Sequence, residues 1–119
     1  MNKGAPAFTV NHHFVGKDPI VRDIYAQLKR AITRFGPIVE EPKKTSIHIV
    51  NRTALAGVAT RRAHLVLTIK SDRKLASPRI HKSEQASANR FHHEIRLTSP
   101  ADVDEELKGW LKAAYSLSA

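Results

Sequence analysis

Two stretches of the chain repeat apolar residues at the spacing of an amphipathic helix. In the first, apolar residues recur from Ile20 to Ile32 with a period near 3.6, and basic residues take the other side. Asp18 precedes the stripe as an N-cap acid with a proline after it, and Gly36 follows the stripe. The pattern therefore predicts a helix that begins at residue 19 and ends before Gly36.

The second helical stripe lies at the end of the chain. It runs from Val103 to Tyr115 and includes Trp110. Ser99 offers an N-cap hydroxyl, and Asp102 takes the place of the capping-box acid three residues later. The pattern predicts a single helix that begins directly after Ser99.

Between the two helices, apolar and polar residues alternate in the manner of strands. Gly57 indicates a bulge or turn, and residues 71–79 read as a loop. Because no βαβ unit occurs, we expect an α+β two-layer sandwich, order α-β-β-β-β-β-α, whose antiparallel sheet of about five strands carries both helices on one face. Residues 1–17 are expected to form a loose lead-in to a single domain over 18–117. The predicted strands are residues 38–53, 55–62, 63–72, 79–87 and 90–98.

The charge of the chain says more about its partners than its overall composition does. The net charge is +9, and residues 43–96 carry this excess, with twelve Lys and Arg against three acids. Such an excess attracts polyanions, so we expect nucleic acid or an acidic protein surface as the partner; a solvated basic face is the alternative. If the basic loops share one edge of the sheet, they form an anion-binding rim. Its members are Lys43, Lys44, Arg61, Arg62, Arg73, Lys74, Arg79 and Lys82.

Several classes of protein are disfavoured by the sequence. There is no cysteine, which excludes disulfides and cysteine metal sites and suits a reducing compartment. No run of about 20 apolar residues occurs, and the N-terminus lacks the apolar core of a signal peptide, so we expect a cytoplasmic protein without a membrane partner. No cofactor motif is present, and the oligomeric state stays open between monomer and dimer.

Histidines supply the candidate chemistry. If the strand register aligns them, His48, His64 and His92 on the polar sheet face offer a three-nitrogen zinc site, and His48, His64 and Glu94 offer an acid–base site. His93 shares the opposite face with apolar residues and is expected to lie at the core edge. No nucleophile elbow, phosphate loop or paired-carboxylate motif accompanies these residues, so a non-enzymatic binding or accessory module is favoured over a hydrolase- or metal-type enzyme.

Four stretches together resemble the DUF5655 family, a bacterial domain of unknown function. They are HFVGKDP (13–19), GPIVEEPKKTSIHIVNRTALAGV (36–58), HLVLTIKSD (64–72) and RFHHEIRLTSPADVDEELKGWL (90–111). A looser similarity connects the chain to the DUF1801 and YdhG-like α+β domains. The resemblance implies the element order given above. It implies no activity and no catalytic residue, because the family has none to carry over.

Overall fold

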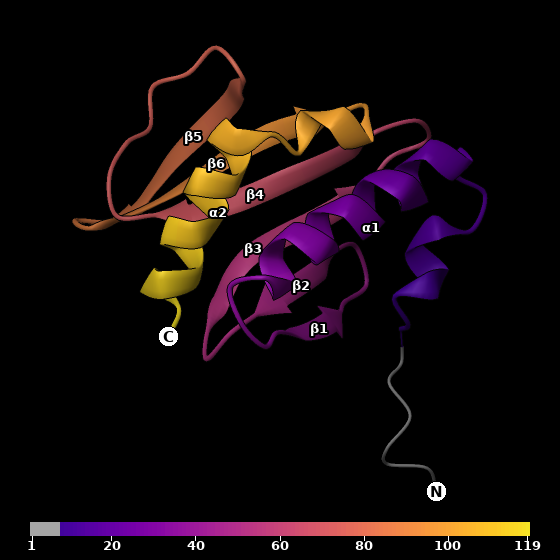
Figure 1. Ribbon diagram of the computed structural model, residues 1–119, viewed down its shortest axis with the longest axis horizontal. Coiled ribbons are helices and arrows are strands. Elements are labelled where there is room, and N and C mark those ends of the chain that lie inside the picture. The colour runs from indigo at the N-terminus through magenta and orange to yellow at the C-terminus, as the bar shows by residue number, and fades with distance from the viewer. Residues whose placement is uncertain (1–7) are drawn as a thin grey trace, which may run out of the picture.

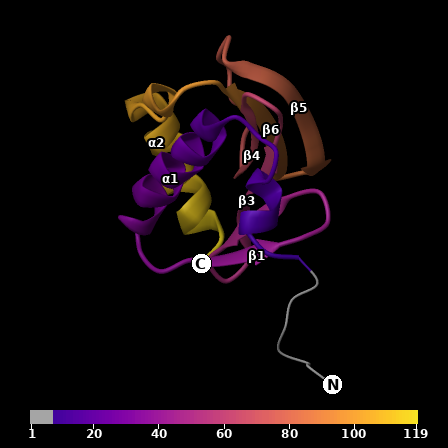
Figure 2. The same ribbon diagram turned by 90° about the vertical axis from the view of Figure 1, so that its right-hand side faces the viewer.

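A computed structural model describes residues 8–119 and shows two layers, one of helices and one of sheet (Figure 1). Seen edge-on, both α-helices lie on the same side of the sheet, and the other sheet face is open (Figure 2). The fold is therefore the predicted α+β sandwich. In chain order, the elements are η1 (Asn11–Phe14), α1 (Pro19–Thr33), β1 (Val39–Pro42), β2 (Ile47–Val50), β3 (Ala54–Thr60), β4 (Leu65–Ser71), β5 (Ile80–Ser87), β6 (Arg90–Leu97), η2 (Pro100–Asp102) and α2 (Glu105–Leu117).

The sheet has six strands in the order β1-β2-β3-β4-β6-β5, and every neighbouring pair is antiparallel. The extra strand arises because the first predicted strand is in fact a hairpin. The amide of Lys43 donates to the carbonyl of Ser46 at 2.7 Å and closes the turn between β1 and β2. Pro42 ends the edge strand β1, where its missing N–H costs no ladder hydrogen bond.

The predicted irregularity at Gly57 lies two residues earlier. Gly57 pairs regularly with His48 on β2 and Thr68 on β4. The register between β2 and β3 instead skips Leu55, whose side chain is fully buried in the core. A bulge turns the extra residue and bends its strand. It thereby brings Leu55 to the helix side, although strict alternation would place it on the same face as Gly57.

Helix α1 begins as predicted, whereas α2 begins later. The Asp18 carboxylate accepts from the amide of Ile20 at 2.9 Å and caps α1. The capping box of Ser99 and Asp102 closes only the short helix η2. The backbone leaves helical geometry after η2, and Asp104 then caps α2 by accepting from the amide of Leu107 at 3.1 Å.

Part of the predicted lead-in belongs to the packed structure. Residues 1–7 lie outside the described range, but Asn11–Phe14 forms η1. Phe14 is buried with its ring 5.3 Å from that of Tyr25, and the Nε2 atom of buried His13 lies 2.8 Å from the carbonyl oxygen of Lys43. Packing therefore starts before residue 18.

The core lies between the helices and the sheet. It is formed by the apolar stripes of α1 and α2 and by the helix-facing residues of β2, β3, β4 and β6. None of the helices within residues 8–119 has the length and apolarity needed to span a membrane.

Candidate anion-binding face of the sheet

The sheet face opposite the helices carries polar side chains in cross-strand rows. One row runs from His48 on β2 through Gly57 and Thr68 to Glu94 on β6. In the next row, Lys70 and His92 are direct partners. No helix within residues 8–119 covers this face (Figure 2), and the residues of both rows are only partly buried.

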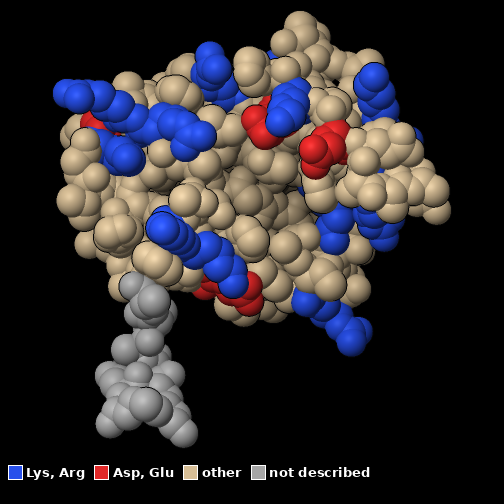
Figure 3. Space-filling model, turned by 180° about the vertical axis from the view of Figure 1, so that it is seen from behind, with Lys and Arg blue, Asp and Glu red and all other residues tan. Residues whose placement is uncertain are grey.

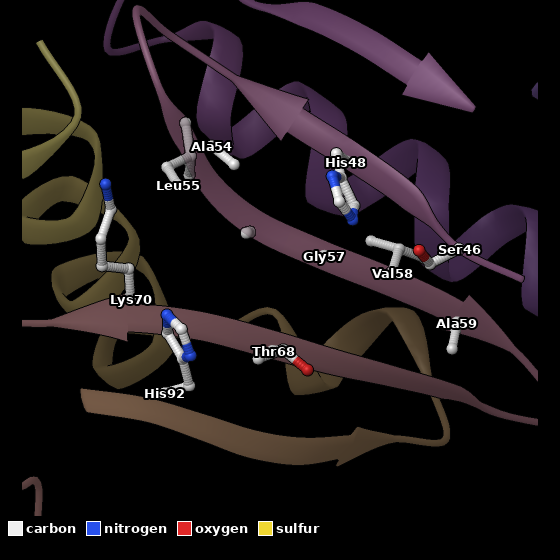
Figure 4. A pocket seen from close by; sticks show the side chains of 11 residues that line it. Ser46, His48, Ala54, Leu55, Gly57, Val58, Ala59, Thr68, Lys70 and His92 are labelled. Atoms are coloured by element: carbon white, nitrogen blue, oxygen red, sulfur yellow. The ribbon is translucent and has the colours of Figure 1, made fainter. Parts of the chain in front are cut away.

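A groove of about 300 Å³ runs along β3 on this open face (Figure 4). Its floor is the backbone of β3 with the small residues Ala54, Gly57 and Ala59. Longer side chains of the flanking strands form its walls, and the gap exists because no β3 residue on this face exceeds a methyl group. The wall residues are Ser46, His48, Thr68, Lys70 and His92.

Among residues 8–119, no carboxylate lines the groove, and Lys70 is the only permanently charged residue that does. Its Nζ donates to the Thr53 hydroxyl at 3.0 Å. Burial, followed by the nearby positive charge of Arg90, lowers the pKa of Lys70. The second cause means that two positive charges lie near each other on this face.

Basic turns lie at one end of this face. Lys43 and Lys44 are in the turn between β1 and β2, and Arg61 and Arg62 are in the turn between β3 and β4. The β2–β3 register places these two turns at the same end of the sheet. Of the four, Lys43 has an acidic neighbour, at 3.7 Å from Glu41, with both side chains about half exposed.

The remaining basic residues do not join that rim. Arg73 and Lys74 follow the far end of β4, about 20 Å away by strand rise. Arg79 is held by Asp104 at 2.7 Å, and Lys82 lies opposite Glu94 in the ladder. The basic rim of the open face is thus limited to the two turns at one end, because Arg73 pairs with Asp72 at 3.2 Å and its loop lines a pocket with α2 on the helix side. Viewed from that face, Lys and Arg side chains lie on several sides of a central hollow (Figure 3).

Comparison with known proteins gives a family. The profile described as "Domain of unknown function (DUF5655)" matches residues 10–118. The chain belongs to the DUF5655 family. No curated protein and no solved structure matches it. The looser similarity to the DUF1801 and YdhG-like domains stays a prediction.

The DUF5655 domain does not gather the three predicted histidines. His48 and His92 both line the groove, but His64 precedes β4 and lies about 13 Å along that strand from the His48 row. There it lines a separate hollow with Arg61 and Arg96, and burial together with these two charges lowers the pKa of His64. Within residues 8–119, no three His, Asp or Glu side chains are placed to hold a metal ion.

The predicted acid–base set is equally dispersed. His48 and Glu94 share a row, but β3 and β4 lie between them, so their Cα atoms are about 14 Å apart. The triplet with His64 therefore cannot act on one bond in this arrangement. The register, which the sequence does not show, decides this outcome.

The two adjacent histidines of β6 have different surroundings. His92 faces the groove, whereas His93 is fully buried, with Nδ1 2.8 Å from the Ser83 hydroxyl and Nε2 3.3 Å from the carbonyl oxygen of Arg73. These contacts tie β5 and the loop after β4 to the sheet. His93 is thus a structural residue of this DUF5655 domain.

A second pocket of about 500 Å³ lies between α2 and the loop after β4. Trp110, Leu75 and Leu117 supply its apolar walls. Trp110 is partly buried and packs against the core, so it both closes the core and lines this opening. Tyr115 does not line it, because its hydroxyl donates to the carbonyl of Pro37 at 2.9 Å.

Sequence reasoning missed the groove itself. The signal present in the sequence is the run ALAGVA at residues 54–59, in which small residues occupy the middle of a predicted strand. We interpreted its glycine as a bulge, and only the register shows that the small residues lie between the longer side chains of His48 and Thr68.

Proposed function

We propose that this DUF5655 domain is a non-enzymatic binding module that holds an anionic partner, nucleic acid or an acidic protein surface, against its open sheet face. The observation that carries the proposal is the groove in the middle of that face, whose lining within residues 8–119 has no carboxylate, with the basic turns of Lys43, Lys44, Arg61 and Arg62 at one end of the sheet. The acids of the face lie beside the groove and not in its lining: Glu94 is the cross-strand partner of Thr68, and Glu84 is that of His92.

The charge distribution supports the same reading. Residues 43–96 contain β2 to β5 and all of β6 except Leu97, and they hold twelve basic residues against three acidic ones. Folding does not need this excess, because clustered like charges repel one another in the compact state. A partner with negative charges is attracted to these basic residues and offsets their mutual repulsion. When the partner is a nucleic acid, its binding also releases the counterions condensed on its phosphates.

The lack of a gathered catalytic set favours a module over an enzyme. The titratable groups of the face, such as His48 and Glu94, are held apart by the sheet, and the groove offers hydrogen-bond donors without a carboxylate partner. The cysteine-free composition supports the cytoplasm as the proposed location.

The test is fluorescence anisotropy with labelled DNA and RNA, from about 50 to 300 mM salt. We expect log affinity to fall linearly with log salt, and we expect Arg61→Ala with Arg62→Ala to weaken binding and reduce the slope by about 2. The matched control is Arg34→Ala with Lys112→Ala, which removes the same charge from exposed positions at the end of α1 and on α2.

An acidic protein or peptide of equal charge serves as the competitor. Displacement of the nucleic acid by that competitor at equal concentration would assign the face to protein partners. If no polyanion binds at about 50 mM salt, the +9 charge is a solvated surface and the proposal fails.

A further inference from the structure

The groove depends on a glycine that the backbone does not require. Gly57 lacks the positive φ seen at Gly16 and Gly36, so a residue with a side chain fits its conformation. A Cβ atom there would meet only the Cδ2 atom of His48, at 3.9 Å, an ordinary contact. Glycine in a central strand weakens the strand, because it adds entropy to the unfolded chain and leaves no side chain to pack.

The space above Gly57 has a floor and two side walls, and polar side chains form the walls. The β3 backbone is the floor, His48 lies on the β2 side, and Thr68 lies on the β4 side (Figure 4). Lys70 and His92 close the end nearer the β2–β3 turn. At about 300 Å³ the groove matches the lower end of small-ligand sites.

Charge complementarity selects the occupant. The lining offers a lysine, two imidazoles and two hydroxyls but no carboxylate. A phosphate alone satisfies the donors but leaves the floor uncovered. A planar ring joined to phosphates fills both parts, since its face lies on the floor and its phosphates meet Lys70 and the basic turns. The edge of the ring then faces the imidazoles and hydroxyls of the walls, which form hydrogen bonds with base edges.

We infer that the groove over Gly57 binds one unpaired base of a single-stranded nucleic acid, whose phosphates run toward the basic turns. This inference rests on the proposed function and narrows its partner to single strands. A duplex keeps its bases stacked and paired, so it presents only phosphates to this face. Single strands expose the base faces that such sites need.

The decisive probes are three labelled DNAs with equal numbers of phosphates: a single strand, an abasic single strand and a duplex. We expect the single strand to bind at least about fivefold more tightly than the abasic strand, which corresponds to about 1 kcal/mol, the size of one net hydrogen bond to the base. Gly57→Val fills the groove with a strand-favouring residue, so the variant melts no lower than the wild type but loses that ratio.

The matched control is Ala86→Val, which adds alkyl bulk on the exposed strand β5, outside the groove lining. If Gly57→Val unfolds, Gly57→Ala replaces it, because the added methyl makes only the contact with His48. Because Gly57→Ala fills less of the groove, we expect it to reduce, but not to abolish, the preference for the normal strand over the abasic strand.

The outcomes separate the two ideas. Equal binding of abasic and normal strands, or a ratio unchanged in Gly57→Val, overturns the base site and leaves the anion-binding face intact. Failure of every nucleic acid to bind overturns the base site together with its nucleic-acid premise. A ratio lost in Gly57→Val and kept in Ala86→Val establishes the site.

Discussion

The contact between Tyr25 and Glu40 joins the first helix to the edge of the sheet, and its removal gives a sharp test of the structure. The Tyr25 hydroxyl donates to Oε2 of Glu40 at 2.5 Å, and Nζ of Lys29 donates to Oε1 of the same carboxylate at 2.9 Å. Tyr25→Phe removes one donor and keeps the ring, which packs 5.3 Å from the ring of Phe14.

The expected loss of stability in Tyr25→Phe follows from the burial of the contact. Hydrogen bonds to charged groups contribute about 1.5–3 kcal/mol, and the Glu40 side chain is only 21% exposed. Water reaches the freed oxygen in part and recovers some of the loss. We therefore expect Tyr25→Phe to lower the free energy of unfolding by about 2 kcal/mol at pH 7. Lys29 is 45% exposed and, being screened, compensates little.

The loss of stability in Tyr25→Phe is expected to become smaller as the pH falls. Burial alone would raise the pKa of Glu40, but the hydrogen bonds from Tyr25 and Lys29 lower it overall from its ordinary value of 4.5. A carboxylate with a lowered pKa in the folded state stabilises the fold fully above its unfolded pKa, and the contribution disappears as the pH falls through the folded pKa. Burial raises the pKa of Tyr25, so its hydroxyl keeps its proton throughout.

Urea unfolding at several pH values between 7 and 3 measures the difference. The wild type and Tyr25→Phe are expected to differ by about 1 M in midpoint at pH 7 and to converge in acid. Tyr115→Phe is the matched control, because its hydroxyl donates to the neutral carbonyl of Pro37 and its loss carries no such pH dependence. A gap between wild type and Tyr25→Phe that stays constant from pH 7 to 3 would refute the reasoning.

Two further changes test other parts of the fold. Gly36→Ala is expected to cost at least about 2 kcal/mol, because Gly36 has φ +152° and the new Cβ would lie 2.3 Å from the Tyr115 hydroxyl; a thermal melt equal to wild type contradicts this. Arg79→Gln removes the partner of Asp104 at the start of α2, so it is expected to lower the free energy of unfolding in urea by about 1–2 kcal/mol. Arg73→Gln is the control, because the Arg73 side chain is 77% exposed and its loss is expected to leave the urea midpoint unchanged. Equal effects of the two variants would show that Arg79 does not hold α2 in place.

The helices and the layer order were predictable because they depend on local patterns. The apolar stripe after Asp18 and the alternation around Leu67 each require only neighbouring residues to be read. The hairpin at Lys43 was missed because a turn without glycine resembles a continuing strand. The capping box of Ser99 was predicted correctly as a motif but closes a shorter helix, since the chain leaves helical geometry at Val103.

The candidate site was harder to predict because it depends on register. His48 and His92 reach the same groove, while His64, equally polar and equally placed by alternation, lies at another end. Arg79 resembled a free cation until the fold brought Asp104 to it, 25 residues along the chain. Long-range pairing decides both cases, and no pattern within a short window contains it.

The two faces of the sheet differ in how much they contribute to stability. Stability resides on the helix side, where β4 alternates buried Leu65, Leu67 and Ile69 with residues that only partly lose contact with water. On the other side, the central strand β3 carries glycine at position 57, although a β-branched residue would stabilise it. Lys70 also lies near Arg90 there, although like charges repel. The proposed anionic ligand over β3 would account for both choices, because it needs the space and neutralises the charge.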